Sequence, residues 1–440
     1  MPFEAPNRPN DPTAPKSRRI AVIGAGISGM GAAHLLAPDN RVVLFESGAR
    51  LGGHARTVMA GKNGDQPVDT GFIVFNYANY PNLAALFEAL EVPVVESNMS
   101  FGASIDGGRF EYALTSLNAI FAQRRNALNP RFLAMLRDIL RFNKDALALA
   151  NSDRSMTLRE FLARLGTGTY FRDYYLLPLS GAIWSTPTEQ IMDFPAHALI
   201  QFFENHALLN VTGQHQWYTV TGGSISYVSR VEAAMKRNGV DIRLNAAVQS
   251  VRRDGVGVEV KTWGGEWERF DEVVFATHSD DTLAMLDDPS PAEAAALGAI
   301  AYQPNDIVLH ADTAIMPKRR ATWASWVYTE DRAAQSDRID LTYWMNSLQP
   351  IPEADPHFVT LNTKRTIREE LIYDQVTLRH PVYDLAALDA QGRVREMNGT
   401  NATWFCGAWM RHGFHEDGLA SAVDVVQALQ ARAAKALAAE

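Results

Sequence analysis

Short apolar runs alternate with a helix-like segment near the start of the chain. Residues 19–23 and 41–46 are almost wholly apolar, and residues 27–37 between them have the length and composition of a helix. Continuous apolar runs of this length are typical of parallel strands buried on both faces. The pattern therefore predicts a strand–helix–strand unit, in which the Pro38-Asp39-Asn40 turn ends the helix.

Apolar residues at helical spacing predict three helices further along, at residues 81–90, 130–150 and 157–166. The last of these has Thr157 as its cap, Glu160 three residues later and Gly166 at its end. The long middle helix is amphipathic. Its predicted apolar stripe consists of Phe132, Leu133, Leu136, Ile139 and Leu140.

Other segments predict further strands, one more helix and two aromatic-rich stretches with two possible roles. Residues 271–277 and 403–406 are apolar runs that predict further buried strands, and a helix is expected at about 224–238. Alternation of apolar and polar residues in 306–312 and 341–346 predicts strands of an antiparallel sheet. The aromatic-rich stretches 170–184 and 202–209 fit either plain core or the lining of an apolar tunnel.

Composition narrows the class of protein. The chain has 440 residues, 47% hydrophobic and 21% charged, which favours a globular protein of two domains. The formal net charge of −9 argues against a nucleic-acid partner. The single cysteine, Cys406, excludes a disulfide framework and a cysteine-rich metal site, so no metal is expected. No apolar stretch is long enough to span a membrane, and a cytoplasmic location is expected.

The first glycine cluster lies between the first strand and its helix, as Gly24-x-Gly26-x-x-Gly29. In this context the glycines allow a tight turn, a close approach of pyrophosphate and close helix packing. The helix start, at Ile27 and Ser28, presents unpaired N–H groups to phosphate. Glu46, followed by Ser47, stands where an acid binds ribose hydroxyls, so the cluster predicts a dinucleotide site.

A second glycine cluster, Gly52-Gly53, follows the second strand and is flanked by Arg50 and Arg56. Adjacent glycines let the backbone run against a ligand without side-chain clash. The two arginines are expected to neutralise pyrophosphate oxygens. A longer dinucleotide needs a second backbone cradle, so FAD is predicted in preference to NAD.

On these residues the sequence resembles the flavin amine oxidase and phytoene desaturase superfamily, whose pattern here is Arg-x-Gly-Gly-Arg. His54 stands where the second arginine is usual, and Arg56 is expected to take over part of its role. A hydrogen-bonding replacement and a covalent flavin link at His54 both remain open. The resemblance also implies cofactor contacts from Ala55, Thr70, Gly71, Phe72 and, through its backbone, Val248.

The closing segment, residues 403–429, extends the resemblance. Gly407 is expected to turn near the flavin phosphates, and Gly418 to start a helix that points at the flavin ring. A helix N-terminus there stabilises negative charge on reduced flavin. The predicted amide donors are Asp417, Gly418 and Leu419.

The predicted fold is α/β: a Rossmann-type FAD-binding domain with an inserted α+β substrate domain, which has an antiparallel sheet and a helical lobe. The FAD-binding domain is expected to interleave three segments, residues 18–75, 215–294 and 399–440. The substrate domain takes residues 76–214 and 295–398. Residues 1–17, with five prolines, are predicted to be a disordered tail.

The sequence further resembles a bacterial subgroup of flavoproteins associated with modification of fatty acyl chains. This implies hydride abstraction from an apolar, lipid-like substrate. Oxidation of a hydrophobic amine is the first alternative, although residues 300–310 lack the lysine usual in amine oxidases. A non-catalytic flavoprotein that binds lipid or partners is the second. His415, Glu416 and His310 are the candidate catalytic residues.

One charged segment indicates a partner. Residues 118–150 carry six basic groups, Arg137 and Arg141 among them, against the two acids Asp138 and Asp145. A basic amphipathic helix fits an anionic lipid surface, and an ordinary solvated helix face is the alternative. The protein is therefore also expected to bind peripherally to the inner face of the membrane.

Overall fold

The computed structural model describes residue 3 and residues 18–184, 191–205, 208–209, 215–331 and 338–437. The predicted disordered tail, residues 1–17, lies outside this range except for Phe3. Phe3 is buried, and its ring stacks on His34 with 6.4 Å between ring centroids.

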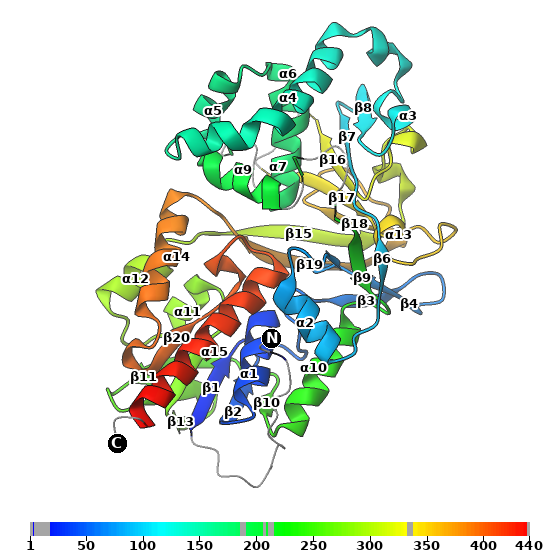
Figure 1. Ribbon diagram of the computed structural model, residues 1–440. Helices are drawn as coiled ribbons and strands as arrows, with labels where there is room; N and C mark the ends of the chain where they lie inside the picture. The colour runs from blue at the N-terminus through cyan, green and yellow to red at the C-terminus, as the bar shows by residue number, and fades with distance from the viewer. Residues whose placement is uncertain are drawn as a thin grey trace.

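A parallel five-stranded sheet forms one end of the molecule (Figure 1). Its spatial order is β10-β2-β1-β14-β20, and the strands are β1 (Arg19–Ile23), β2 (Arg41–Phe45), β10 (Asp241–Arg243), β14 (Glu272–Phe275) and β20 (Thr403–Phe405). The predicted strand–helix–strand unit is confirmed, with α1 (Ile27–Leu36) as its helix. The chain thus has the predicted α/β fold.

Both faces of this sheet are covered, which explains the continuous apolar runs. Ile20 and Val22 of β1 pack into one core, while Ala21 and Ile23 pack into another. The first core contains residues of α1, α10 (Ile225–Arg237) and α15 (His415–Leu437). The second contains residues of β11 (Val248–Arg253), β12 (Val258–Thr262), β13 (Trp267–Phe270), α11 (Ser279–Met285), α12 (Pro291–Leu297) and α14 (Leu385–Met397).

The long C-terminal helix begins at His415, not at Gly418 as predicted. The glycine serves helix packing instead: a Cβ atom at Gly418 would lie 2.8 Å from Ser28 Oγ and 2.9 Å from Ile27 Cγ2. The same crossing requires Gly31, where a Cβ would lie 2.5 Å from Leu419 Cδ1. Glycines on both helices let α1 and α15 approach closely.

A seven-stranded sheet lies between the cofactor-binding sheet and the helical lobe (Figure 1). Its order is β19-β15-β18-β17-β16-β7-β8, and its strands are β7 (Phe101–Ile105), β8 (Phe110–Ala113), β15 (Tyr302–His310), β16 (Trp326–Glu330), β17 (Asp340–Trp344), β18 (Phe358–Leu361) and β19 (Ile372–Pro381). The predicted antiparallel pairing is correct for every neighbouring pair except β7 and β16, which run parallel.

Smaller elements join the two sheets. These are the pair β3 (Thr57–Ala60) and β4 (Gln66–Asp69), the three strands β5 (Val74–Phe75), β6 (Val94–Ser97) and β9 (Trp217–Val220), and the helices α2 (Pro81–Ala89) and α13 (Met345–Leu348). Helix α2 confirms the helix predicted at residues 81–90.

The helical lobe is the end of the molecule furthest from the cofactor-binding sheet (Figure 1). It contains α3 (Leu117–Ile120), the short helix η1 (Arg124–Leu128), α4 (Pro130–Ser152), α5 (Leu158–Leu165), α6 (Thr169–Phe171), the π-helical turn η2 (Arg172–Leu176), α7 (Leu177–Trp184) and α9 (Ala196–Asn205). Helix α5 has the predicted Thr157–Glu160 capping box and ends at Gly166 in the left-handed region. Phe171, Leu176 and Phe203 are buried in the core. This agrees with the core interpretation of the aromatic-rich stretches 170–184 and 202–209.

The predicted stripe of α4 is partly wrong. Phe132 and Ile139 are buried, but Leu133 and Leu140 are exposed. The buried face is instead completed by Met135, Asp138, Phe142, Ala146 and Ala150. Within the described ranges, every helix falls short of the length or apolar character needed to cross a bilayer.

Candidate cofactor and active site

The first glycine turn lies at the carboxyl ends of β1, β2 and β14. Gly24 has a φ of +97°, and a Cβ there would lie 2.9 Å from the Ala276 carbonyl oxygen. A Cβ at Gly29 would lie 1.7 Å from the Gly24 carbonyl oxygen. A Cβ at Gly26, by contrast, would meet no protein atom within 4 Å. The fold itself requires Gly24 and Gly29, while the space beside Gly26 suits a ligand.

The N-terminus of α1 offers free hydrogen-bond donors beside that space. Gly26 is the N-cap and contributes no side-chain cap. The first bond within the helix runs from the Met30 amide to the Gly26 carbonyl, at 2.9 Å. The amides of Ile27, Ser28 and Gly29 therefore have no partner within the helix and suit the pyrophosphate of a dinucleotide.

Glu46 stands at the end of β2 with its carboxylate against the glycine turn. Its Oε2 accepts from the Ala25 amide at 2.8 Å, and its Oε1 accepts from the Gly48 amide at 2.8 Å and from Ser47 Oγ at 3.2 Å. The Glu46 carbonyl accepts from the Ala246 amide, which brings the start of β11 and Val248 to the same edge. This arrangement suits ribose and adenine recognition.

The two glycine clusters touch each other. The Gly52 amide donates to the Ala25 carbonyl at 2.8 Å, and a Cβ at Gly53 would lie 2.9 Å from the Gly26 Cα. A Cβ at Gly52 would lie 2.6 Å from the Ala55 carbonyl oxygen. Both positions have positive φ. Gly52 and Gly53 are thus needed for the two loops to pack together, which the sequence interpretation missed.

Segment 69–72 packs against the second loop. The Thr70 amide donates to the Arg56 carbonyl at 2.8 Å, and the Phe72 amide donates to the His54 carbonyl at 2.9 Å. A Cβ at Gly71 would lie 1.9 Å from the same His54 oxygen. Three segments predicted to contact the cofactor therefore form one continuous stretch of close-packed backbone.

Both flanking arginines already have partners within the protein. Arg50 donates to the carbonyls of Leu51, Gly53 and Ala55, so it braces the loop internally. Arg56 forms a two-pronged ion pair with Asp374 of β19, at 2.6 and 3.0 Å. A guanidinium whose charge is balanced in this way ties the loop to the substrate sheet and is a poor phosphate ligand.

The three candidate catalytic side chains are held by structural contacts. His415 stacks on Phe72 with 4.0 Å between ring centroids, and its Nε2 lies 2.6 Å from the Tyr227 hydroxyl. Burial lowers the pKa of His415 to about 3. Such a histidine is neutral at pH 7 and braces the segment around Phe72.

Glu416 caps a different helix. Its carboxylate accepts from the Asn82 amide at 3.1 Å, the Asn82 side chain at 2.7 Å and the Leu83 amide at 2.9 Å. These amides belong to the first turn of α2, where a negative charge stabilises the helix dipole. Glu416 therefore acts as a buried cap that ties α15 to α2, a role that does not fit a general base.

His310 is fully buried within β15. Its Nδ1 accepts from the Asp312 amide at 3.1 Å, so its Nε2 carries the proton and donates to Thr360 Oγ1 at 2.8 Å. Burial lowers its pKa to about 4. Both nitrogens are thus occupied within the sheet, an arrangement that fits a structural histidine better than a general base.

The expected donors of the C-terminal helix also change. The Gly418 amide donates to the Phe414 carbonyl at 3.1 Å, and Leu419 is the fifth residue of α15, past the free amides of its first turn. Asp417 is the one predicted donor that lies in that turn. Gly407 is required because a Cβ there would lie 2.3 Å from Trp409 Nε1. Cys406 is buried, and burial raises its pKa to about 12, so its thiol is unreactive.

The structure adds a histidine cluster that the sequence interpretation missed. The His54 ring lies 5.5 Å from the His380 ring and 6.0 Å from the His278 ring. His54 Nε2 is buried without a hydrogen-bond partner, which makes it a donor or acceptor for a ligand. His278 lies three residues after the end of β14, at the ligand-binding edge of the sheet. Its position after a predicted strand could have identified it from the sequence.

The pH dependence of the free energy of unfolding tests whether these histidines are buried and neutral in the folded protein. Burial lowers the pKa of His278, His380 and His415 to about 3 each. The unfolded chain binds their protons first, so the free energy of unfolding should fall as the pH drops below 6.5 and towards 4. Each histidine contributes a slope of about 1.4 kcal/mol per pH unit.

Replacing His415 by glutamine should remove one of these protons. We expect the H415Q variant to show a pH slope shallower by about 1.4 kcal/mol per unit between pH 6 and 4, in urea denaturation of the flavin-loaded protein. Equal slopes in the two proteins would show that His415 is already charged in the folded state.

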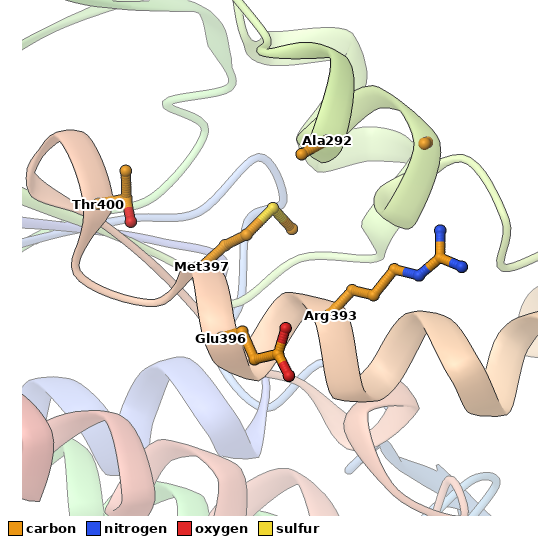
Figure 2. A pocket seen from close by; sticks show the side chains of 6 residues that line it. Ala292, Arg393, Glu396, Met397 and Thr400 are labelled. Atoms are coloured by element: carbon orange, nitrogen blue, oxygen red, sulfur yellow. The ribbon is translucent and has the colours of Figure 1, made fainter.

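A pocket of about 450 Å³ lies away from these residues, between α12 and α14 (Figure 2). Met397 of α14 points toward Ala292 of α12, and Arg393, Glu396 and Thr400 also line the pocket. None of the predicted cofactor or catalytic residues lines this pocket.

Two glycine turns, a free helix N-terminus and an acid at the end of β2 define a dinucleotide-binding protein. The chain belongs to the family of flavin containing amine oxidoreductases, whose model matches residues 27–356. It is a flavin-dependent oxidoreductase, FAD is its cofactor, and the residues described above fit that group.

Solved structures confirm the fold, each with 94% of this chain aligned to 99% of the other. They include a CLA-producing fatty acid isomerase from P. acnes, with a TM-score of 0.67 and 14% identity. Cyclohexylamine oxidase from Brevibacterium oxydans IH-35A has a TM-score of 0.62 and 14% identity. Putrescine oxidase bound to putrescine has a TM-score of 0.63 and 14% identity. A search of curated proteins finds no match.

Proposed function

We propose that this oxidoreductase removes a hydride from an apolar, lipid-like substrate, in the manner of a fatty acyl dehydrogenase or desaturase. Bound FAD supplies the two-electron acceptor. The protein's part is to hold the substrate carbon beside the cofactor and to exclude water from it.

The observation that carries this proposal is one face of the seven-stranded sheet. Asp374 and His380 of β19 both face the cofactor loop, since Asp374 pairs with Arg56 and the His380 ring lies beside His54. Side chains alternate along a strand, so Val376 and Leu378 between them point the same way. The cofactor loop therefore faces a pair of aliphatic side chains.

The apolar face continues across the neighbouring strands. Residues directly opposite in an antiparallel pair share a face. The register places the polar Asn305 of β15 opposite Leu378. It places Ile307 opposite Val376 and Leu309 opposite Asp374, with Leu361 and Val359 of β18 opposite Ile307 and Leu309 in turn. The four aliphatic side chains of β15 and β18 are buried in the same core cluster as the helical lobe. An acyl chain entering from the lobe would contact hydrocarbon along this path.

Electrostatics on this path disfavour a cationic substrate. Asp374 is the one acid among the side chains just named, and Arg56 already balances its charge. An ammonium group would thus lose hydration without gaining a counter-charge there.

Oxidation of a hydrophobic amine is the second candidate, because the family model and two of the similar structures are those of amine oxidases. It requires a neutral amine held by aromatic rings. Trp326 and Tyr343, which lie 5.3 Å apart and pack against the same core, are the side chains suited to that role.

Anaerobic mixing distinguishes the two candidates. We expect acyl lipids to bleach the flavin absorbance and hydrophobic amines to leave it unchanged, measured by stopped-flow spectroscopy. Bleaching by amines with no response to acyl lipids would contradict the proposal.

A pair of variants on one strand places the substrate. Val376→Asn puts a polar group on the apolar face, and Gln375→Asn changes the opposite, exposed face. We expect V376N to slow flavin reduction about tenfold while Q375N leaves it unchanged. Equal rates in the two variants would place the substrate elsewhere.

A further inference from the structure

Exposed leucines are concentrated in one segment of the chain, around the start of α4 in the helical lobe. Among described residues, five of the thirteen large apolar side chains that are exposed fall between residues 114 and 140. Leu117 is 76% exposed, Leu128 is 88% exposed and Leu140 is 58% exposed. Scattered exposed leucines are ordinary, but a local concentration marks an interaction surface.

The loop elements that carry these leucines are fixed to one another. Arg124 Nη2 of η1 donates to Asn118 Oδ1 of α3 at 2.6 Å, and the Phe121 ring lies 5.8 Å from the Phe132 ring of α4. Asn129 caps α4 through the Arg131 and Phe132 amides. Leu117, Leu128 and the start of α4 therefore belong to a single ordered surface.

The outer face of α4 mixes leucine with basic residues. At 3.6 residues per turn, its members fall within about 100° of arc. They are Leu133, Arg137, Leu140, Arg141 and Lys144, and all are exposed. The two leucines are seven residues apart and lie on nearly the same line along the helix. We call these residues, with Leu117, Arg124, Arg125 and Leu128, the leucine–arginine surface.

The charge of this surface is largely unbalanced. Arg124 and Arg141 donate to neutral oxygens, those of Asn118, Phe121 and Gly166. Arg125 donates to the Arg109 carbonyl. Arg137 is the exception and pairs with the buried Asp138. The leucine–arginine surface thus carries positive charge although the formal net charge of the chain is −9.

We propose that the leucine–arginine surface docks the protein on a bilayer that contains anionic phospholipid. Arginine and lysine would contact lipid phosphates, while the interleaved leucines enter the boundary between headgroups and acyl chains. A nucleic acid offers the charge without the hydrocarbon, whereas a bilayer presents phosphates directly above a continuous hydrocarbon layer, so the interleaved leucines favour the bilayer. This docking does not depend on which substrate the enzyme oxidises.

Vesicle flotation with the flavin-loaded, full-length protein tests the proposal. We expect binding to phosphatidylglycerol vesicles and not to phosphatidylcholine vesicles. Reversal of two charges, Arg141→Glu with Lys144→Glu, should lower the partition coefficient at least about tenfold. Replacement of two leucines, Leu128→Asn with Leu140→Asn, should lower it about tenfold or more.

A matched control uses the same chemistry on other surfaces. Lys62 and Leu385 are both exposed, so Lys62→Glu with Leu385→Asn changes equivalent side chains outside the leucine–arginine surface. The control should bind as the wild type does, and flavin content reports that every variant is folded. Equal binding to both lipids, or unchanged binding in either test variant, would overturn the proposal. Loss in the charge variant alone would show that charge attraction accounts for binding without insertion of the leucines.

Discussion

Replacing Gly26 by alanine is expected to weaken FAD binding strongly while leaving the fold intact. The backbone at Gly26 has a φ of −70° and a ψ of −175°, which any residue adopts without strain. The added methyl would meet no protein atom within 4 Å. It would instead fill the space in front of the free amides of α1, where pyrophosphate must approach the backbone.

The measurements are flavin content after purification, the dissociation constant on reconstitution, and the melting temperature of the flavin-free protein. We expect at least a hundredfold weaker binding, equivalent to about 2.7 kcal/mol, with an unchanged apoprotein melting temperature. Gly392→Ala is the matched control, because a Cβ at Gly392 in α14 also meets nothing within 4 Å. Normal flavin binding by G26A would place the cofactor elsewhere.

Gly29→Ala is expected to behave differently from Gly26→Ala although the two glycines belong to one motif. Its methyl would lie 1.7 Å from the Gly24 carbonyl oxygen, so the turn and helix must separate. We therefore expect the apoprotein itself to be destabilised. The contrast between the two variants distinguishes a glycine needed for cofactor binding from a glycine needed for folding.

Replacing Asp69 by alanine is expected to cause the largest loss of stability. Its carboxylate is buried and accepts hydrogen bonds from Thr57 Oγ1 at 2.6 Å, from the Ser224 amide and hydroxyl, and from Gln349 Nε2 at 3.0 Å. Burial raises the pKa of Asp69 to about 6, while these donors limit the rise. The group is therefore ionised at pH 7 and organises the start of α10.

Alanine would leave these buried donors without an acceptor, at about 1–3 kcal/mol for each group. We expect D69A to lower the free energy of unfolding by at least about 3 kcal/mol, measured by chemical denaturation of the flavin-loaded protein. Asp65→Ala, in the exposed turn between β3 and β4, should change it by less than about 0.5 kcal/mol. Equal stability of D69A and D65A would show that the network contributes nothing.

Local patterns in the sequence were sufficient for the cofactor half of the molecule. The apolar runs of β1, β2 and β14, the glycine turn and Glu46 lie within a few residues of the contacts they make. The same is true of the Thr157–Glu160 cap of α5. Such features depend on backbone conformation and near neighbours, so residue type and spacing carry the information.

The roles of polar side chains in the candidate site depended on distant partners. Glu416 meets Leu83 across 333 positions of sequence, and Arg56 meets Asp374 across 318. Nothing near either residue distinguishes a structural cap or ion pair from a catalytic or phosphate-binding group. The histidine cluster was missed for the same reason, because His380 reaches His54 through the pairing of the substrate sheet.

The sequence by itself determined the α/β fold and the position of the dinucleotide turn, since these follow from periodicity and backbone freedom, and its family resemblance indicated FAD. Only the tertiary structure decided which polar groups are already paired, which leucines of α4 face outward, and that α15 begins three residues before Gly418. Each of those outcomes depends on burial and on partners contributed by distant segments, and such contacts exist only after the chain has packed.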